Sequence, residues 1–462
     1  MSATPAPLFI ALADSLERQI RDGVYRGGDK LPSLREIAAT RSYGKNTVVS
    51  AFELLVARGL VEPRRGSGFF VKEAVPEVRN EDVQGHSLRR TMDIVWLLRM
   101  QLRNEPGQLA VGDAFPPSQW LEGARLDRTH HKVARGGLGT LFRYGDRLGY
   151  APLRHRLVRR LADMGIDAHP QQIVLTHGAN EAMDLIVRYF VPAGGVVLID
   201  DPGYYPLRGK LRLAGARVVG VPRLVDGPDL QALEQALKTL RPRLFFTQSL
   251  AHNPTGSDLS LAKARAVLRL AEQHNLLLVE NDALGDFRPA AAPRLSALDG
   301  LERTLYLGSF SKSLSAALRV GFVACSPDLA QELADLKVLT GVSSSEYAER
   351  AVETLLAERR YPRHLEQLRG KLAEATHGAY ALLDRMGAEV FVHPSHSLFI
   401  WARWPDFADA QALAQAMLGE GIVMAPGNIF CVDSEASCAW SRCNPHAVLD
   451  PRFARALERL RG

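Results

Sequence analysis

The stretch that decides the fold is TLYLGSFSKSLSAALRVGFVA, residues 304–324. Two apolar runs, typical of short buried strands, enclose a serine-rich turn that carries one lysine, Lys312. Burial or a nearby cation lowers the pKa of a lysine amine and frees it as a nucleophile. We therefore expect Lys312 to form a Schiff base with an aldehyde. The alternative is a solvated loop that holds one lysine.

Arg319 and several serines lie in the same turn. Their guanidinium and hydroxyl groups can hold a phosphate by charge-assisted hydrogen bonds. A lysine that forms a Schiff base beside a phosphate site fits a phosphorylated aldehyde, and pyridoxal phosphate is such a molecule. The turn therefore predicts pyridoxal phosphate as the cofactor.

Upstream of this turn, apolar runs alternate with segments of helical periodicity. The alternation predicts a mainly parallel sheet with helices on both faces, and in such sheets the ligand site forms at the carboxyl ends of the strands. Polar clusters follow the runs and converge at that edge. The runs are residues 173–176, 196–199, 217–221, 244–247, 276–279 and 304–307, and the clusters are residues 176–180, 201–204, 252–256, 281–282 and 309–312.

The 462 residues have the composition of a globular protein with two or three domains. The net charge of +6 permits contact with nucleic acid but does not require it. Four irregularly spaced cysteines indicate neither a disulfide framework nor a metal site, and we expect buried or incidental thiols in a cytoplasmic protein. No apolar run approaches the ~20 residues of a membrane span, so no membrane association is expected.

The first 75 residues have the pattern of a winged helix-turn-helix. Helical patterns occupy about residues 7–24, 34–40 and 46–58, and Ser33 is suited to cap the second helix. Two short apolar strands at 60–62 and 69–71 enclose a basic turn. Such a module places the last of the three helices in the major groove of double-stranded DNA. The alternative is a solvated basic face on a protein-interaction domain.

Residues 8–72 resemble the DNA-binding domain of the GntR family. The resemblance rests on GDKLPSLREIA at 28–38, NTV at 46–48 and VEPRRGSGFFV at 61–71. Many relatives carry arginine at position 45, and Lys45 can pair with a phosphate but cannot make the bidentate contact of arginine with guanine. The resemblance implies DNA contacts by Ser33, Arg35, Lys45, Asn46, Thr47, Arg64, Arg65 and Gly66.

Residues 108–462 resemble the fold-type I pyridoxal phosphate enzymes of the aspartate aminotransferase superfamily. The motifs are RYGDRLGYAPLR at 143–154, NPTG at 253–256 and the turn at 309–321. A GntR-type head on such a domain is the architecture of the MocR subfamily of transcriptional regulators. We expect a DNA-binding domain at 1–74 and a linker at 75–107, with a short buried helix in the linker near 92–102. Residues 108–462 should form an aminotransferase-like α/β domain with a smaller C-terminal α+β subdomain.

The resemblance also implies roles for individual side chains. Tyr204 stacks on the pyridine ring, Asn253 bonds the phenolic oxygen, and Arg442 clamps the carboxylate of an amino acid effector. The alternatives are that Tyr204 is a core aromatic residue, that Asn253 stabilises a turn, and that Arg442 forms a structural salt bridge. The implied phosphate ligands are Arg319, Ser309, Ser311 and the N-terminal residues of a helix, Gly178, Ala179 and Asn180.

One departure from the family pattern concerns the pyridine nitrogen. Relatives pair that nitrogen with an aspartate and reach the phenolic oxygen with a tyrosine, where this chain has Asn281 and Leu284. If the register slips by one residue, Asp282 supplies the carboxylate. A neutral amide does not hold the nitrogen protonated, so the electron sink is weak.

We therefore expect a homodimeric regulator that binds a DNA operator and has weak or no transaminase turnover. It would sense pyridoxal phosphate, or an amino acid or amine effector, by aldimine chemistry at Lys312. One alternative is an active aminotransferase with a DNA-binding head. A third possibility is a repressor whose large domain serves only for dimerisation.

Overall fold

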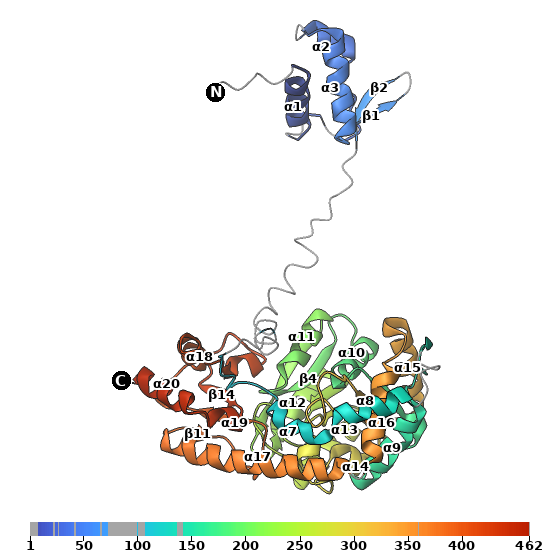
Figure 1. Cartoon of the computed structure of the whole chain (residues 1–462). Coiled ribbons are helices and arrows are strands. Elements are labelled where there is room, and N and C mark those ends of the chain that lie inside the picture. Colours follow the sequence, from blue (N-terminus) through green and yellow to red (C-terminus); the bar gives the residue numbers. More distant parts are fainter. Residues whose placement is uncertain are drawn as a thin grey trace. The chain divides into compact units, whose positions relative to one another are not determined.

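The structure is a computed structural model that describes residues 8–21, 24–25, 27–40, 43–64, 67–72, 99, 107–135, 142–358 and 360–461 (Figure 1). The chain divides into two compact units, Met1–His86 and Ser87–Gly462. The predicted linker helix near 92–102, apart from Arg99, lies outside the described residues, as do Arg65 and Gly66 of the wing. The domain limits at 74/75 and 107/108 stay predictions.

The first unit is the predicted winged helix-turn-helix. Its helices α1 (Leu8–Arg21), α2 (Leu34–Thr40) and α3 (Lys45–Ala57) precede an antiparallel hairpin of β1 (Val61–Arg64) and β2 (Gly68–Val71). The apolar stripes of the three helices and the inward side chains of the hairpin form one core. That core contains Leu12, Leu16, Ile37, Val48, Phe52, Leu55, Val61 and Val71.

Ser33 caps α2, as the sequence predicts. Its hydroxyl accepts a hydrogen bond from the backbone N–H of Glu36, and the carboxylate of Glu36 accepts one from the backbone N–H of Ser33. This reciprocal pair is a capping box, and it fixes the start of the helix.

The second unit contains an eight-stranded sheet in the order β3-β10-β9-β8-β7-β4-β5-β6. Neighbours from β9 to β5 are parallel, and β10 and β6 run antiparallel to their neighbours. The prediction of a mainly parallel sheet is confirmed. The strands are β3 (Ile173–Thr176), β4 (Val196–Asp201), β5 (Arg217–Leu224), β6 (Gly227–Pro228), β7 (Leu244–Thr247), β8 (Leu277–Asn281), β9 (Thr304–Ser309) and β10 (Gly321–Ala324).

Helices cover both faces of this sheet (Figure 1). Alternate residues of the strands enter different cores, because successive side chains of a strand point to opposite faces. One face packs against α10 (Ala179–Phe190), α11 (Tyr205–Leu213) and α15 (Pro327–Gly341). The other packs against α9 (Ala151–Asp163), α12 (Leu230–Leu240), α13 (Leu261–Gln273) and α16 (Glu346–Ala357).

The C-terminal part forms the predicted smaller subdomain. The long helix α17 (Arg360–Arg385) leads into an antiparallel sheet of β11 (Glu389–Val390), β12 (Ile400–Arg403), β14 (Trp440–Cys443) and β13 (Ala425–Pro426). Helices α18 (Ala410–Gly419) and α20 (Pro451–Arg461) pack on it, and Leu109 pairs with Ile422 at its edge. None of the helices among the described residues combines the length and apolar character that a membrane span requires.

Candidate cofactor and DNA sites

Lys312 lies in the turn that connects β9 to β10, as predicted. Its Nζ atom lies 3.0 Å from the ring centroid of Phe115. Burial lowers the pKa of Lys312 to about 7; the carboxylate of Asp113 opposes this shift, and the cations of Arg442 and Arg319 add to it. A large share of the amine is therefore unprotonated at neutral pH and able to attack an aldehyde.

Asp286 holds this turn in place. Its carboxylate accepts hydrogen bonds from the hydroxyls of Ser313, at 2.5 Å, and Tyr361, at 2.9 Å, and it forms an ion pair with Arg160. The side chain of His364 lies 2.8 Å from the carbonyl oxygen of Ser313. These contacts fix the residue next to Lys312, and the sequence did not predict them.

A site for a phosphate lies where α10 begins. Residues 178–180 start this 12-residue helix, whose free backbone N–H groups attract anions. The guanidinium of Arg319 lies beside Gly178. If residue 178 carried a Cβ atom, that atom would be 2.9 Å from Nη2 of Arg319. Arg319 also donates to the hydroxyl of Ser311 at 3.5 Å, and the hydroxyls of Ser309 and Ser311 are 3.2 Å apart. The structure brings all the predicted phosphate ligands together.

Tyr204 and Asn281 line one small buried cavity of about 20 Å³. Tyr204 directly precedes α11 and Asn281 ends β8, so two strand ends contribute to it. Asp200 lines the same cavity, but its carboxylate accepts a hydrogen bond from Thr247 at 2.8 Å and lies 3.5 Å from Arg223. The predicted ring-stacking and ring-nitrogen positions therefore face the same space.

Asp282 does not join this cavity. It lies on the other face of the sheet, where its carboxylate forms a fully buried ion pair with Arg294 at 2.7 Å and accepts a hydrogen bond from Tyr306 at 2.8 Å. The strand alternation explains the difference, since neighbouring residues point to opposite faces. Of the two registers, the structure selects Asn281 and removes Asp282 from the set of cofactor-facing residues. Leu284, at the tyrosine position, is buried in an apolar cluster.

Arg442 lies at the centre of the predicted carboxylate site. It donates to the side-chain oxygen of Asn253 at 2.9 Å and to the carbonyl of Gly112 at 2.7 Å, between the rings of Phe399 and Phe430. Among the described residues, no carboxylate lies within ion-pair distance of it, and its buried Nε has no hydrogen-bond partner. Arg442 therefore forms no structural salt bridge with the described residues.

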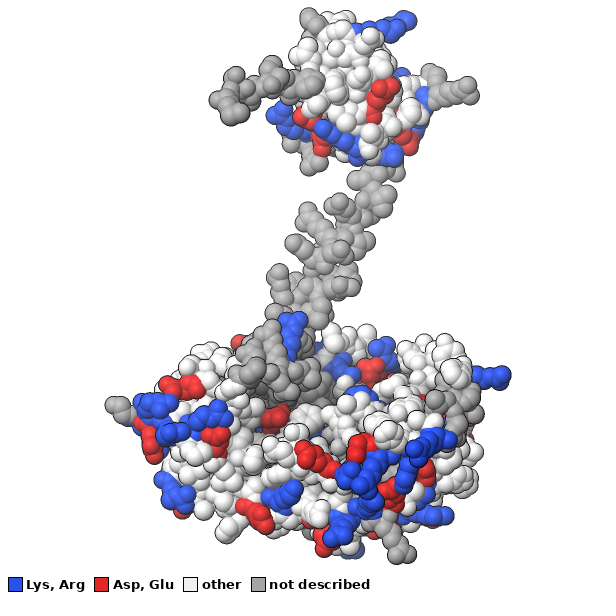
Figure 2. Space-filling model, viewed as in Figure 1, with Lys and Arg blue, Asp and Glu red and all other residues white. Residues whose placement is uncertain are grey.

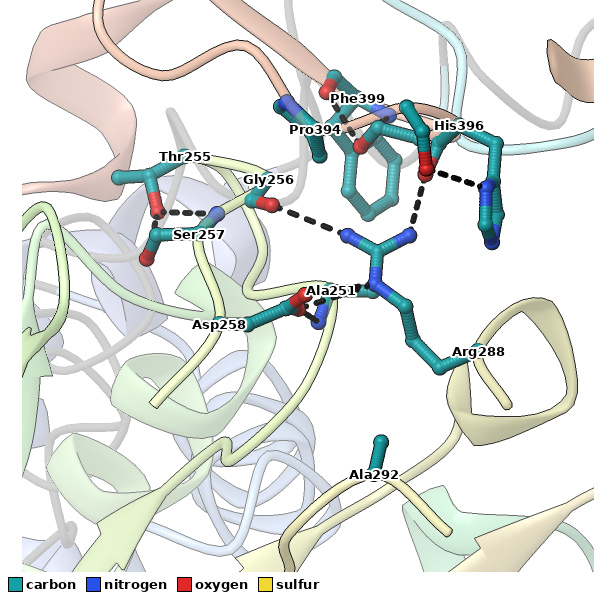
Figure 3. Close-up of polar contacts among 12 residues, drawn as sticks. Ala251, Thr255, Gly256, Ser257, Asp258, Arg288, Ala292, Pro394, His396 and Phe399 are labelled. Atoms are coloured by element: carbon teal, nitrogen blue, oxygen red, sulfur yellow. Dashed lines mark hydrogen bonds and ion pairs between the residues drawn. The ribbon is translucent and has the colours of Figure 1, made fainter. Parts of the chain in front are cut away.

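Arg288 joins the loop of Asn253 to the C-terminal subdomain (Figure 3). Its Nε donates to both carboxylate oxygens of Asp258, at 3.0 and 2.9 Å, and its Nη2 donates to the carbonyl of Gly256 at 3.2 Å. Its Nη1 donates to the carbonyl of His396 on the opposite segment. Sequence reasoning missed Arg288, because nothing local connects it to either loop.

A larger cavity, of about 1120 Å³, lies beside the Lys312 turn. Asp113 and Phe115 line it, and sequence reasoning missed both. Their segment has no periodicity of its own, and contacts with the distant C-terminal subdomain place it, among them the pairing of Leu109 with Ile422 and the hydrogen bond from Asn444 to the carbonyl of Phe115. Its other lining residues include Leu121, Glu122, Arg125, Leu314, Ser315, Asn444 and His446.

The predicted DNA-facing residues that the structure describes lie at the N-terminal ends of α2 and α3 and on β1. Arg35 is exposed on the first turn of α2, and Lys45 and Asn46 are exposed at the start of α3, next to the half-buried Thr47. Arg64 is exposed on β1, where it pairs with Glu62 at 2.9 Å and stacks on Phe70. Figure 2 shows both basic and acidic side chains on the described surface of each unit.

Comparisons with known proteins match both units. The model of the bacterial regulatory proteins of the gntR family matches residues 11–71, and that of aminotransferase class I and II matches residues 112–460. The uncharacterized HTH-type transcriptional regulator YdcR of Escherichia coli is 31% identical over 93% of this chain and 92% of its own length. The chain is a MocR-type member of the GntR family.

Aminotransferases are also similar to this MocR-type chain. The 2-aminoadipate transaminase of Thermus thermophilus is 30% identical over 72% of this chain and 84% of its own length. The crystal structure of LysN, an α-aminoadipate aminotransferase of the same organism in complex with N-(5'-phosphopyridoxyl)-L-leucine, superimposes with a TM-score of 0.72. It is 28% identical and covers 79% of this chain and 94% of its own.

The residues of the MocR-type chain fit pyridoxal phosphate. The lysine of lowered pKa, the helix N-terminus with Arg319 and the cavity of Tyr204 supply one partner for each part of the cofactor. The free Nε of Arg442 can donate to a carboxylate. The family and the site together indicate pyridoxal phosphate as the cofactor.

Proposed function

We propose that this MocR-type chain is a transcriptional regulator that senses pyridoxal phosphate, or an amino acid or amine, by aldimine chemistry at Lys312. The observation that carries the proposal is the neutral amide of Asn281 in the cavity of Tyr204. When bound, pyridoxal phosphate supplies an aldehyde that captures amines and a ring that withdraws electrons from them. A carboxylate would hold the ring nitrogen protonated, and Asn281 cannot. The site therefore favours capture over turnover.

The other residues of the site support a sensor of small amino compounds. Lys312 provides an amine that is partly unprotonated at neutral pH. Arg442, pre-oriented by Asn253 and stacked between two aromatic rings, provides a fork for a carboxylate. Binding can change the affinity for DNA only if the two conformations of the protein differ in affinity for the effector.

The proposal includes a cytoplasmic homodimer. A symmetric dimer presents two recognition helices to paired half-sites of a double-stranded DNA operator. Large side chains that are almost fully exposed on the second unit support a surface that a second copy covers. Phe142 is 85% exposed, Tyr144 81% and Leu339 85%.

An active aminotransferase with a DNA-binding head is the second candidate. The similarity to the 2-aminoadipate transaminase favours it. The two candidates differ in turnover: the sensor binds L-amino acids without repeated conversion, whereas the enzyme gives fast ping-pong kinetics with a second keto acid. Steady-state assays with a panel of L-amino acids and keto acids distinguish them, and fast turnover would overturn our proposal.

The binding step itself is tested by absorbance. Protein incubated with pyridoxal phosphate and then desalted should retain the absorbance of bound cofactor, and Lys312→Ala should lose it. Lys238→Ala, which removes a lysine of α12 that pairs with Glu234, tests whether such a loss is specific to Lys312. A colourless wild-type protein would favour a large domain that serves only for dimerisation.

A further inference from the structure

Two thiols outside the cofactor site lie together in the C-terminal subdomain. Cys431 follows the short helix η5 (Gly427–Phe430), and Cys438 lies two residues before β14. Both sulfur atoms lie against the same residue, Gly427. Cys431 Sγ lies 3.4 Å from the carbonyl oxygen of Gly427, and a Cβ atom added to Gly427 would be 2.5 Å from Cys438 Sγ. Glycine at 427 therefore leaves room for the pair.

The pair contains one thiol that is suited to react with an oxidant. Interaction with the neighbouring thiol of Cys431 lowers the pKa of Cys438 to about 7, and interaction with Cys438 raises the pKa of Cys431. The thiolate is the reactive form of cysteine, and both side chains are only half-buried. Cys325 and Cys443 differ in both respects, because they are fully buried and burial raises the pKa of each to about 12.

We propose that Cys431 and Cys438 are a redox-sensitive pair that a peroxide converts into a disulfide. The Cys438 thiolate attacks one peroxide oxygen, the O–O bond breaks, and hydroxide leaves, so that Cys438 becomes a sulfenic acid. The sulfur of Cys431 loses its proton and attacks the Cys438 sulfur, and the S–O bond breaks with release of water. Two thiols thus lose two electrons and two protons, and hydrogen peroxide is reduced to two water molecules.

The disulfide would act on the cofactor site through Phe430. This residue directly precedes Cys431, and its ring stacks on Arg442 with 4.9 Å between the guanidinium carbon and the ring centroid. Its carbonyl accepts a hydrogen bond at 2.9 Å from the backbone N–H of Gly203, the neighbour of Tyr204. A disulfide holds the two sulfurs at bonding distance, and we expect this to displace Phe430, because Phe430 directly precedes Cys431. We therefore expect weaker binding of pyridoxal phosphate, a consequence that rests on the proposed function.

The cross-link is tested on the full chain with hydrogen peroxide and peptide mass mapping. Wild-type protein should give a peptide pair joined through Cys431 and Cys438, with Cys325 and Cys443 unmodified. Cys431→Ser should stop at an oxidised Cys438 without a cross-link, and Cys438→Ser should leave Cys431 unreactive. Equal modification of all four thiols, or no cross-link in wild type, would overturn the proposal.

The effect on the site is tested by titrating pyridoxal phosphate into reduced and oxidised protein. Oxidation should weaken binding about 5-fold or more, dithiothreitol should restore it, and Cys431→Ser should show no such loss after the same treatment. Unchanged affinity in fully cross-linked protein would overturn the coupling. If the reduced protein binds no pyridoxal phosphate, the proposed function fails, while the mass mapping still decides the thiol pair.

Discussion

Asn281 ends β8 with its side chain on the cavity that Tyr204 also lines. In the proposed site, an amide there would contact the cofactor ring without holding a proton on its nitrogen. Asn281→Asp should therefore raise the rate of single-turnover transamination at least about tenfold, equivalent to about 1.4 kcal/mol of barrier. Stopped-flow absorbance with a panel of L-amino acids measures it.

Asn281→Ala is the matched control, because it removes the amide without adding a carboxylate. We expect no gain in rate for that variant. A wild-type rate as fast as that of Asn281→Asp would contradict the assigned role of the amide.

The amine of Lys312 makes capture of pyridoxal phosphate dependent on pH. With a pKa lowered by burial to about 7, the ammonium form dominates at lower pH, so the rate of capture should rise with pH around a midpoint near 7. Asp113 raises this pKa, and Asp113→Asn should therefore move the midpoint to lower pH. Capture followed by absorbance across pH measures both midpoints. A shift to higher pH in the variant would contradict the electrostatic role of Asp113.

At the scale of single residues, the sequence predicts what a local motif carries. Lys312, Arg319 and Asn253 stand in short motifs with a specific chemistry, and the structure places them at one site. The choice between Asn281 and Asp282 depends on which face of β8 each occupies, and the register decides that only in the folded sheet. Other contacts of the site join segments far apart in the chain, which no local pattern encodes.

At the scale of elements, the apolar runs predict the strands well, because both faces of a parallel sheet are buried. The antiparallel directions of β10 and β6 were not predicted, since strand direction depends on the connecting segments. The loop at 107–117 was not predicted either, because its position depends on the pairing of Leu109 with Ile422.

Arg288 links two such segments. Arg288→Ala removes charged hydrogen bonds to Asp258 and two carbonyls, and we expect the free energy of unfolding to fall by roughly 1.5–3 kcal/mol. Arg303, a half-buried arginine that donates one hydrogen bond to Asn275, is the control, and Arg303→Ala should change stability by about 0.5 kcal/mol or less. Denaturant unfolding measures both. An equal loss of unfolding free energy in the two variants would show that the contacts of Arg288 between the two segments do not stabilise the fold.

At the scale of the whole molecule, the two units have separate cores and separate sites. Arg35→Ala should weaken binding to a DNA fragment selected by this protein by about 1–3 kcal/mol and leave the absorbance of bound pyridoxal phosphate unchanged. Fluorescence anisotropy and absorbance on the same preparation test this. Loss of both properties together would contradict the assignment of Arg35 to a DNA site separate from the cofactor site.

We propose that the ligand at Lys312 controls DNA binding. The most direct measurement is the affinity of the full chain for its selected DNA fragment, with and without pyridoxal phosphate, for wild type and Lys312→Ala. We predict a change of about 5-fold or more in wild type and none in Lys312→Ala. The same change in both proteins, or no change in either, would show that Lys312 does not couple the ligand to DNA binding.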